Sequence, residues 1–134
     1  MNTKRRILFV CTGNTCRSVL AEYLGRRFHS DTFLFESAGI TPQKAEDAEN
    51  AVFILRDHFR IDASGHQPRD VRNVDFAGFE MAIAIGSNAA DVVEALGIPK
   101  SKLIVWSIPD PWGGDLTEYA DAALAIRKHL ARLR

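Results

Sequence analysis

The sequence predicts an α/β fold, in which a single domain over residues 1–134 forms a three-layer α/β/α sandwich around a four-stranded parallel sheet. Short apolar runs alternate with segments of helical periodicity along the chain, the pattern of parallel strands joined by right-handed crossover helices. The chain has 134 residues, of which 46% are hydrophobic and 25% charged, and this balance suits one globular domain.

The first half of the chain predicts two strands and two helices. Residues 7–10 are an unbroken apolar run, typical of a buried strand. Residues 17–29 predict a helix, because apolar side chains recur on one side of it at Val19, Leu20, Tyr23, Leu24 and Phe28. Residues 33–35 predict a second strand, which leads into Ser37-Ala38-Gly39. Residues 45–59 predict a second helix with apolar positions at Ala48, Val52, Leu55 and Phe59.

The second half begins with a polar stretch, residues 60–78, which is interrupted by Gly65, Pro68 and Gly78. A loop of this length is usually functional or carries short structure of its own. Residues 81–85 and 103–105 predict the third and fourth strands. Gly86-Ser87-Asn88 predicts a turn and cap before a helix over residues 89–96. The last helix is predicted over residues 116–133, whose apolar residues, Tyr119 among them, alternate by three and four and are expected in the core.

Composition excludes several classes of protein. Lys plus Arg equals Asp plus Glu, 17 each, which argues against a protein that coats nucleic acid or anionic membrane. The apolar run at residues 7–11 is too short for a signal peptide or a membrane span. Two cysteines cannot form a disulfide scaffold, and the cysteines and four histidines show no metal-binding spacing. We therefore expect no metal, no cofactor and a reducing, cytoplasmic location.

Open parallel sheets bind ligands at the carboxyl ends of their strands. Four segments are predicted to meet at that edge, namely residues 11–18, 37–39, 86–88 and 107–114. The chemistry is expected to draw on these four.

The strongest motif is Cys11-Thr12-Gly13-Asn14-Thr15-Cys16-Arg17-Ser18, between the first strand and the first helix. The small and polar residues allow the backbone to curl into a cup whose N–H groups bind an anion, beside a helix N-terminus. The guanidinium of Arg17 can hold two phosphate oxygens at once.

The same loop predicts that Cys11 is a nucleophile. Helix N-termini and nearby cations lower the pKa of thiols and so favour the reactive thiolate. Ser18 is placed to hydrogen-bond Cys11, and Asn14 is suited to a positive φ. Alternatively, Cys11 and Cys16 are small buried hydrophobic residues, as free cysteines often are. The complete motif in its strand–loop–helix context favours an active site.

Cleavage of a phosphate ester needs a proton donor for the leaving group. Asp110 is the candidate acid, since it follows the fourth strand and its backbone is restrained between two prolines. The alternative is a plain turn, because Pro-Asp-Pro is also good turn chemistry. Asp115 is interpreted as the N-cap of the last helix.

These motifs together resemble the low-molecular-weight protein tyrosine phosphatases, and the resemblance covers nearly the whole chain. The loop from Cys11 to Ser18 matches the family signature near the N-terminus, and Asp110-Pro111-Trp112 matches its Asp-Pro-aromatic motif. Residues 37–39 and 61–69 match two further segments, with Ser64, His66 and Arg69 in the expected places.

The resemblance implies a role for each matching residue. Cys11, Arg17 and Asp110 are the implied catalytic residues, and residues 12–18 are the implied phosphate-binding loop (Thr12, Gly13, Asn14, Thr15, Cys16, Arg17 and Ser18). Asn14, Ser18, Ser37 and His66 are implied to form a supporting network. Thr12, Thr15 and Trp112 are implied to line the substrate pocket. Cys16 matches a cysteine that can pair with the nucleophile on oxidation, although a simple packed thiol fits it equally well.

The expected function is hydrolysis of phosphorylated proteins or peptides through a phosphocysteine, with phosphate or another oxyanion in the loop. Three segments depart from the usual pattern of the family, and one of them, Trp112-Gly113-Gly114, lacks the tandem tyrosines found in some members. Ile85-Gly86 stands where many members have Met-Asp, and Thr15 replaces a bulky aliphatic residue. Threonine at this position resembles the phosphoarginine phosphatases of the same family, so phosphotyrosine and phosphoarginine both stay open as substrates.

Three other classes remain as alternatives. A phosphocysteine carrier module also places a cysteine after its first strand, although Arg17 and Asp110 argue against it. A thiol-dependent arsenate reductase resembles the loop but needs relay cysteines beyond Cys16, and the chain has none. A catalytically dead phosphoprotein-binding domain fits least, because all the catalytic residue types are present.

Overall fold

The sheet at the centre of the molecule has four parallel strands in the order β2-β1-β3-β4. In the computed structural model, which describes residues 4–133, the strands are β1 (Arg5–Cys11), β2 (Phe33–Gly39), β3 (Met81–Ile85) and β4 (Leu103–Trp106). β1 and β2 run in register to their ends, so that Cys11 lies opposite Gly39. This arrangement confirms the predicted four-stranded parallel sheet.

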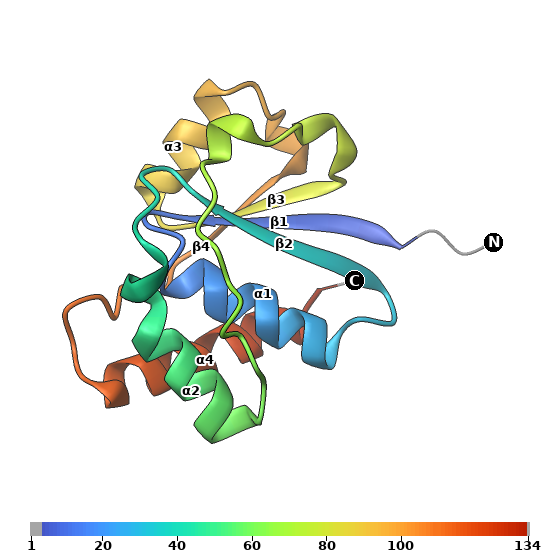
Figure 1. Ribbon diagram of the computed structural model, residues 1–134. Coiled ribbons are helices and arrows are strands. Elements are labelled where there is room, and N and C mark those ends of the chain that lie inside the picture. The colour runs from blue at the N-terminus through green and yellow to red at the C-terminus, as the bar shows by residue number, and fades with distance from the viewer. Residues whose placement is uncertain (1–3, 134) are drawn as a thin grey trace.

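Helices cover both faces of the sheet, as Figure 1 shows. α1 (Arg17–Phe28), α2 (Glu49–Phe59) and α4 (Leu116–Leu130) lie on one side, and α3 (Ser87–Ala95) lies on the other. α2 packs against α1 and α4. The predicted three-layer α/β/α sandwich is therefore confirmed. Within residues 4–133, no helix combines the length and the apolar character that a membrane span requires.

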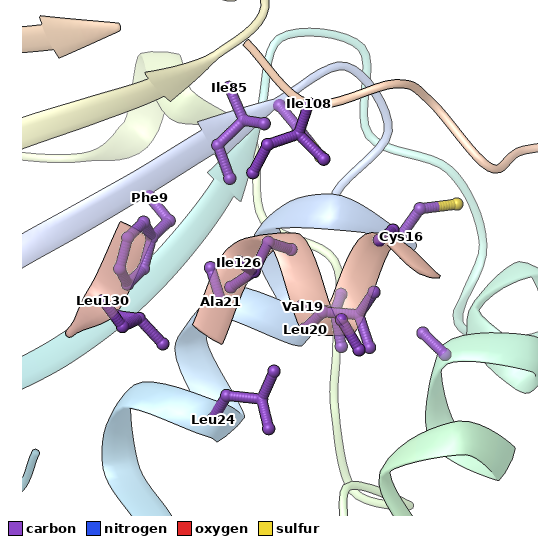
Figure 2. Close-up of a cluster of buried hydrophobic side chains, with 14 of the residues drawn as sticks. Phe9, Cys16, Val19, Leu20, Ala21, Leu24, Ile85, Ile108, Ile126 and Leu130 are labelled. Carbon is purple, nitrogen blue, oxygen red and sulfur yellow. The ribbon is translucent and has the colours of Figure 1, made fainter. Parts of the chain in front are cut away.

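A buried apolar cluster joins the sheet to α1 and α4. Phe9 of the central strand stacks on Phe35, with ring centroids 5.5 Å apart, and lies 5.4 Å from Trp106. Ala21, Leu24, Ile126 and Leu130 of the two helices share this cluster with Phe9 (Figure 2). A second, smaller cluster lies between the opposite face of the sheet and α3. Burial on both faces explains why residues 7–11 of β1 are an unbroken apolar run rather than an alternating one.

Several predicted helix boundaries are wrong. Residues 45–59 are not one helix, because residues 45–48 form a 3₁₀ turn before α2. α3 begins at Ser87 rather than residue 89, and Gly86, with φ 111°, provides the turn into it. α4 ends at Leu130 rather than residue 133.

The long polar stretch after α2 carries short structure of its own, in agreement with expectation. It contains two 3₁₀ turns, Val71–Asn73 and Phe76–Gly78, each capped by a preceding aspartate. It also pairs Asp70 with Gly39 beyond the outer side of β2. This pairing brings the segment around His66 to the edge of the sheet where β1 and β2 end.

Candidate active site

The loop from Cys11 to Ser18 lies where β1 ends and α1 begins. Its carbonyl groups are held from outside by the segment that follows β2. Ile40 donates its N–H to the Cys11 oxygen at 3.0 Å, and Thr41 donates to the Thr12 oxygen at 2.8 Å. Because these carbonyls face outward, the opposite sides of the peptides turn toward the inside of the loop. This is the orientation that forms an anion-binding nest.

A small cavity of about 60 Å³ opens inside this loop. Its walls bring together residues from three separate parts of the sequence. They are Cys11, Thr12, Gly13, Thr15, Cys16, Arg17, Gln43, Asp110 and Trp112. The volume suits a compact tetrahedral group. The predicted nucleophile, arginine, acid and aromatic wall are therefore in one place.

Arg17 lies almost wholly inside the protein, with 8% of its surface exposed. Its Nη1 donates to the Ile108 oxygen at 3.1 Å, and its Nη2 is 3.6 Å from Asp110 Oδ2. Its Nε is the one buried side-chain nitrogen or oxygen of residues 4–133 that has no hydrogen-bond partner. An unpaired buried donor is costly. An oxyanion bound in the loop would supply the missing acceptor.

Gly86 permits this position of Arg17. A Cβ at Gly86 would lie 3.2 Å from Arg17 Nη1, closer than side chains normally approach. The glycine that stands where many members of the family have aspartate therefore lies directly against the Arg17 guanidinium.

Cys11 begins a chain of buried hydrogen bonds. Cys11 Sγ and Ser18 Oγ are 2.9 Å apart. Asn14 Nδ2 donates to Ser18 Oγ and to Ser37 Oγ, at 2.8 Å in both cases. Since a thiolate has no proton to give, Ser18 is the donor whenever Cys11 is ionised. The network therefore offers the nucleophile a fixed donor that stabilises its negative charge.

Asn14 also holds the shape of the loop. Its backbone has φ 56°, a positive value that asparagine adopts more readily than most residues. His66 Nε2 lies 2.8 Å from the Asn14 carbonyl oxygen, and the Arg69 N–H donates to Asn14 Oδ1 at 2.9 Å. Asn14, Ser18, Ser37 and His66 are thus brought together as the resemblance implied.

Glu22 extends this network, and the sequence analysis missed it. It is 6% exposed, Ser37 Oγ donates to it, and Arg26 pairs with it at 2.5 Å. Burial raises the pKa of Glu22, against the opposing effect of the Ser37 hydrogen bond. A signal was present, because Glu22 is one helical turn after Ser18 and so lies on the same face of α1.

Asp110 stands at the mouth of the cavity. Its Oδ1 accepts from the Trp112 N–H at 3.0 Å, which fixes the carboxylate against its own turn. About half of the Asp110 side chain is exposed, so that water can reach it. Trp112 is similarly exposed and lines the cavity. Asp115 accepts from the Glu118 N–H and caps α4, as predicted.

Cys16 sits at the N-terminus of α1 and is buried in the cluster shown in Figure 2. Its Sγ lies 3.3 Å from the Tyr119 hydroxyl. Burial raises the pKa of the Cys16 thiol to about 11 and raises that of Tyr119 as well. Cys11 and Cys16 are both free thiols. Tyr119 entered the sequence analysis only as an apolar core residue, because nothing in its spacing marks the hydroxyl.

Gln43 is a further residue that the sequence analysis missed. It lies on the exposed segment after β2, and its side chain lines the cavity. The Thr15 hydroxyl donates a hydrogen bond to Gln43 Oε1 at 2.5 Å. Across residues 4–133, no group of three or more His, Cys, Asp or Glu side chains is placed to hold a metal ion.

Comparison with known families gives a match over almost the whole chain. The family model for low molecular weight phosphotyrosine protein phosphatases matches residues 6–134. Among curated proteins, the chain is similar to an arsenate reductase of Bacillus cereus, at 29% identity over 132 residues, covering 98% of this chain and 96% of that one.

Two solved structures share both fold and moderate sequence identity. A low molecular weight protein tyrosine phosphatase from T. tengcongensis has a TM-score of 0.82 and 27% identity, covering 97% of this chain and all of that one. The YwlE arginine phosphatase from Geobacillus stearothermophilus has a TM-score of 0.84 and 28% identity, covering 96% of this chain and 89% of that one. These relatives carry three different activities in their names, so similarity alone does not choose the substrate.

Proposed function

The chain belongs to the low molecular weight phosphotyrosine protein phosphatase family, and from that premise we propose that it hydrolyses phosphorylated proteins or peptides through a phosphocysteine on Cys11. The observation that carries the proposal is the single cavity shared by Cys11, Arg17 and Asp110. The buried, unpaired Nε of Arg17 supports it, because this donor calls for an anionic partner.

In the first step, the Cys11 thiolate attacks phosphorus and forms the S–P bond while the bond to the leaving group breaks. Asp110 gives its proton to the leaving oxygen or nitrogen. The loop N–H groups and Arg17 hold the three remaining phosphoryl oxygens, on which negative charge collects.

In the second step, water attacks the phosphocysteine and the S–P bond breaks. Asp110, now ionised, takes a proton from this water, and Ser18 donates a hydrogen bond to the departing thiolate. The half-exposed position of Asp110 suits this double role, since it reaches both the cavity and solvent. The products are inorganic phosphate and the regenerated enzyme.

The test is to measure kcat/KM of the reduced protein on two matched peptides, one with phosphotyrosine and one with phosphoarginine. Phosphate release from at least one of them is expected. Cys11→Ser is expected to lose turnover and still bind phosphate, because the loop and Arg17 remain. Turnover that persists in Cys11→Ser would exclude Cys11 as the nucleophile.

Phosphotyrosine is the substrate that the family as a whole suggests, and Trp112 offers a surface on which a phenol ring can stack. Phosphoarginine is a second candidate because of Thr15, a polar side chain in the wall of the cavity. The similarity to an arginine phosphatase at 28% identity is consistent with it.

Arsenate reduction is less well supported than hydrolysis, although curated relatives carry that name. Arsenate would fit a phosphate loop, but its reduction takes two electrons, which a pair of reactive thiols would supply. The chain has two cysteines, and the second, Cys16, is buried with its pKa raised to about 11, which makes it less reactive than an ordinary thiol. Thiol-dependent reduction of arsenate by the purified protein would overturn this choice.

A carrier function predicts a phosphocysteine that persists until a partner accepts it. Asp110 beside the thiol favours hydrolysis instead. Because catalysis needs Cys11 as a free thiol, we expect the protein to work in a reducing compartment such as the cytoplasm.

A further inference from the structure

Gln43 is fixed against the outside of the phosphate-binding loop. Its backbone N–H donates to the Gly13 oxygen at 3.0 Å. Its side chain crosses directly over Gly13, where any Cβ would collide with the Gln43 carboxamide. The carboxamide is thus held at the rim of the cavity, on the wall shared with Thr15.

The hydrogen bond between Thr15 and Gln43 has a fixed direction. The carboxamide oxygen Oε1 of Gln43 has no hydrogen, so the Thr15 hydroxyl must be the donor over their 2.5 Å separation. A hydroxyl group has one proton and two lone pairs. Because this one proton is engaged in the hydrogen bond to Gln43, the Thr15 oxygen can act toward a substrate only as an acceptor.

An acceptor in this wall discriminates between leaving groups. Phosphoryl oxygens and the bridging oxygen of phosphotyrosine are themselves acceptors, so they gain nothing from Thr15. A phosphorylated guanidino group carries N–H donors beside the bond to phosphorus. Thr15 and the Asp110 carboxyl group both line the cavity and can accept from such donors.

We propose that Gln43 is a specificity-determining residue, which keeps Thr15 as an acceptor and thereby biases the site toward phosphoryl groups carried on a guanidino nitrogen. This inference rests on the proposed phosphatase function. In the reaction, Cys11 forms the S–P bond, the P–N bond breaks, and Asp110 protonates the leaving nitrogen. Water then releases phosphate as before.

Two substitutions separate the acceptor from the bulk of the side chain. Gln43→Met keeps the length and removes the acceptor oxygen, so Thr15 becomes free to turn its proton into the cavity. Gln43→Glu keeps an acceptor at the same place. Gln67→Met is the matched control, because Gln67 is an exposed glutamine outside this cavity.

The measurement is the ratio of kcat/KM for matched phosphoarginine and phosphotyrosine peptides, which cancels any loss common to both substrates. The wild-type protein is expected to favour phosphoarginine. Gln43→Met is expected to lower the ratio about tenfold, the effect of one hydrogen bond. Gln43→Glu and Gln67→Met are expected to keep the ratio close to that of the wild type.

The possible failures are distinguishable. If the wild type releases phosphate from neither peptide, the proposed function is wrong and this inference is wrong with it. If the wild type is active but prefers phosphotyrosine, or if Gln43→Met leaves the ratio unchanged, only the role of Gln43 is overturned. A ratio in Gln43→Glu as low as in Gln43→Met would also overturn it, because the acceptor would then be irrelevant.

Discussion

Arg17 keeps two guanidinium nitrogens near protein oxygens and a third buried without a partner. Lysine carries the same charge but cannot form the bidentate fork to a phosphoryl group. Arg17→Lys is therefore expected to lower kcat/KM about 10²–10³-fold, the usual loss for one removed oxyanion donor.

The matched control for this change is Arg27→Lys, at the far end of the same helix. It is expected to keep the wild-type kcat/KM, because the Arg27 guanidinium lies over the Phe28 ring, away from the loop. Equal kcat/KM of Arg17→Lys and Arg27→Lys would contradict this role, because a positive charge at residue 17 would then be sufficient for catalysis without the bidentate fork.

The contribution of Asp110 to kcat/KM is expected to be larger for a substrate with a poorer leaving group. Asp110→Asn removes the proton donor and is expected to lower kcat/KM on a phosphotyrosine peptide by about 10²–10⁴-fold. The loss in kcat/KM on p-nitrophenyl phosphate is expected to be much smaller, because nitrophenolate leaves without protonation.

Asp115→Asn serves as the control for this aspartate, since asparagine is as good an N-cap as aspartate. It is expected to keep wild-type activity on both substrates. Equal losses on the two substrates in Asp110→Asn would contradict the role of Asp110 as general acid.

The phosphate-binding loop is an element whose conformation depends on Asn14. Asn14→Ala removes side-chain bonds to Ser18, Ser37 and the Arg69 N–H, and it leaves an alanine at φ 56°. Each lost bond costs roughly 1 kcal/mol and the strained backbone about 1 more. Urea denaturation is expected to give a free energy of unfolding about 4 kcal/mol below the wild type.

The exposed Asn73, in the 3₁₀ turn after Asp70, provides the control for this prediction. Asn73→Ala is expected to change the free energy of unfolding by less than about 0.5 kcal/mol, as surface substitutions usually do. An Asn14→Ala variant as stable as Asn73→Ala would mean that the network does not hold the loop.

Sequence reasoning is most successful for elements whose residues are close together in the chain. The loop from Cys11 to Ser18 can be predicted because strand, turn and helix follow one another within a few residues. Ser37 and His66 were assigned through the family resemblance, since their contacts with Asn14 span 23 and 52 residues.

Gln43 could not be predicted from the sequence, and for Glu22 the spacing from Ser18 indicated the helix face but not the burial. An exposed glutamine in a loop has the pattern of a solvated side chain, and only the fold brings it to Gly13 and Thr15. Glu22 lies in a predicted amphipathic helix, where a charge suggests the solvent side. Its burial depends on Ser37 and Arg26, which periodicity does not reveal.

For the whole molecule, the pH dependence of stability reports on the burial of Cys16. The folded protein holds the Cys16 proton up to a pKa of about 11, whereas the ordinary value for a thiol is 9.0. Between these values the folded state binds more protons than the unfolded state, so the free energy of unfolding falls as pH rises. The raised pKa of Tyr119 acts in the same direction.

Cys16→Ala is expected to make this fall shallower between pH 9 and 10, because one of the two groups is removed. Urea denaturation of both proteins across this range is the measurement. A steeper fall in Cys16→Ala than in the wild type would contradict the assignment.

The central claim for the whole molecule is that the reaction passes through one covalent intermediate, a phosphoryl group on Cys11. Asp110→Asn is expected to accumulate it from p-nitrophenyl phosphate, because formation needs no acid while release loses its base. Mass spectrometry of the denatured, digested protein is then expected to find the phosphoryl group on the peptide that contains Cys11, and on no peptide of Cys11→Ala, which has no nucleophile at this position. Hydrolysis by Asp110→Asn that continues with Cys11 unmodified, or a phosphoryl group on another residue, would contradict the mechanism.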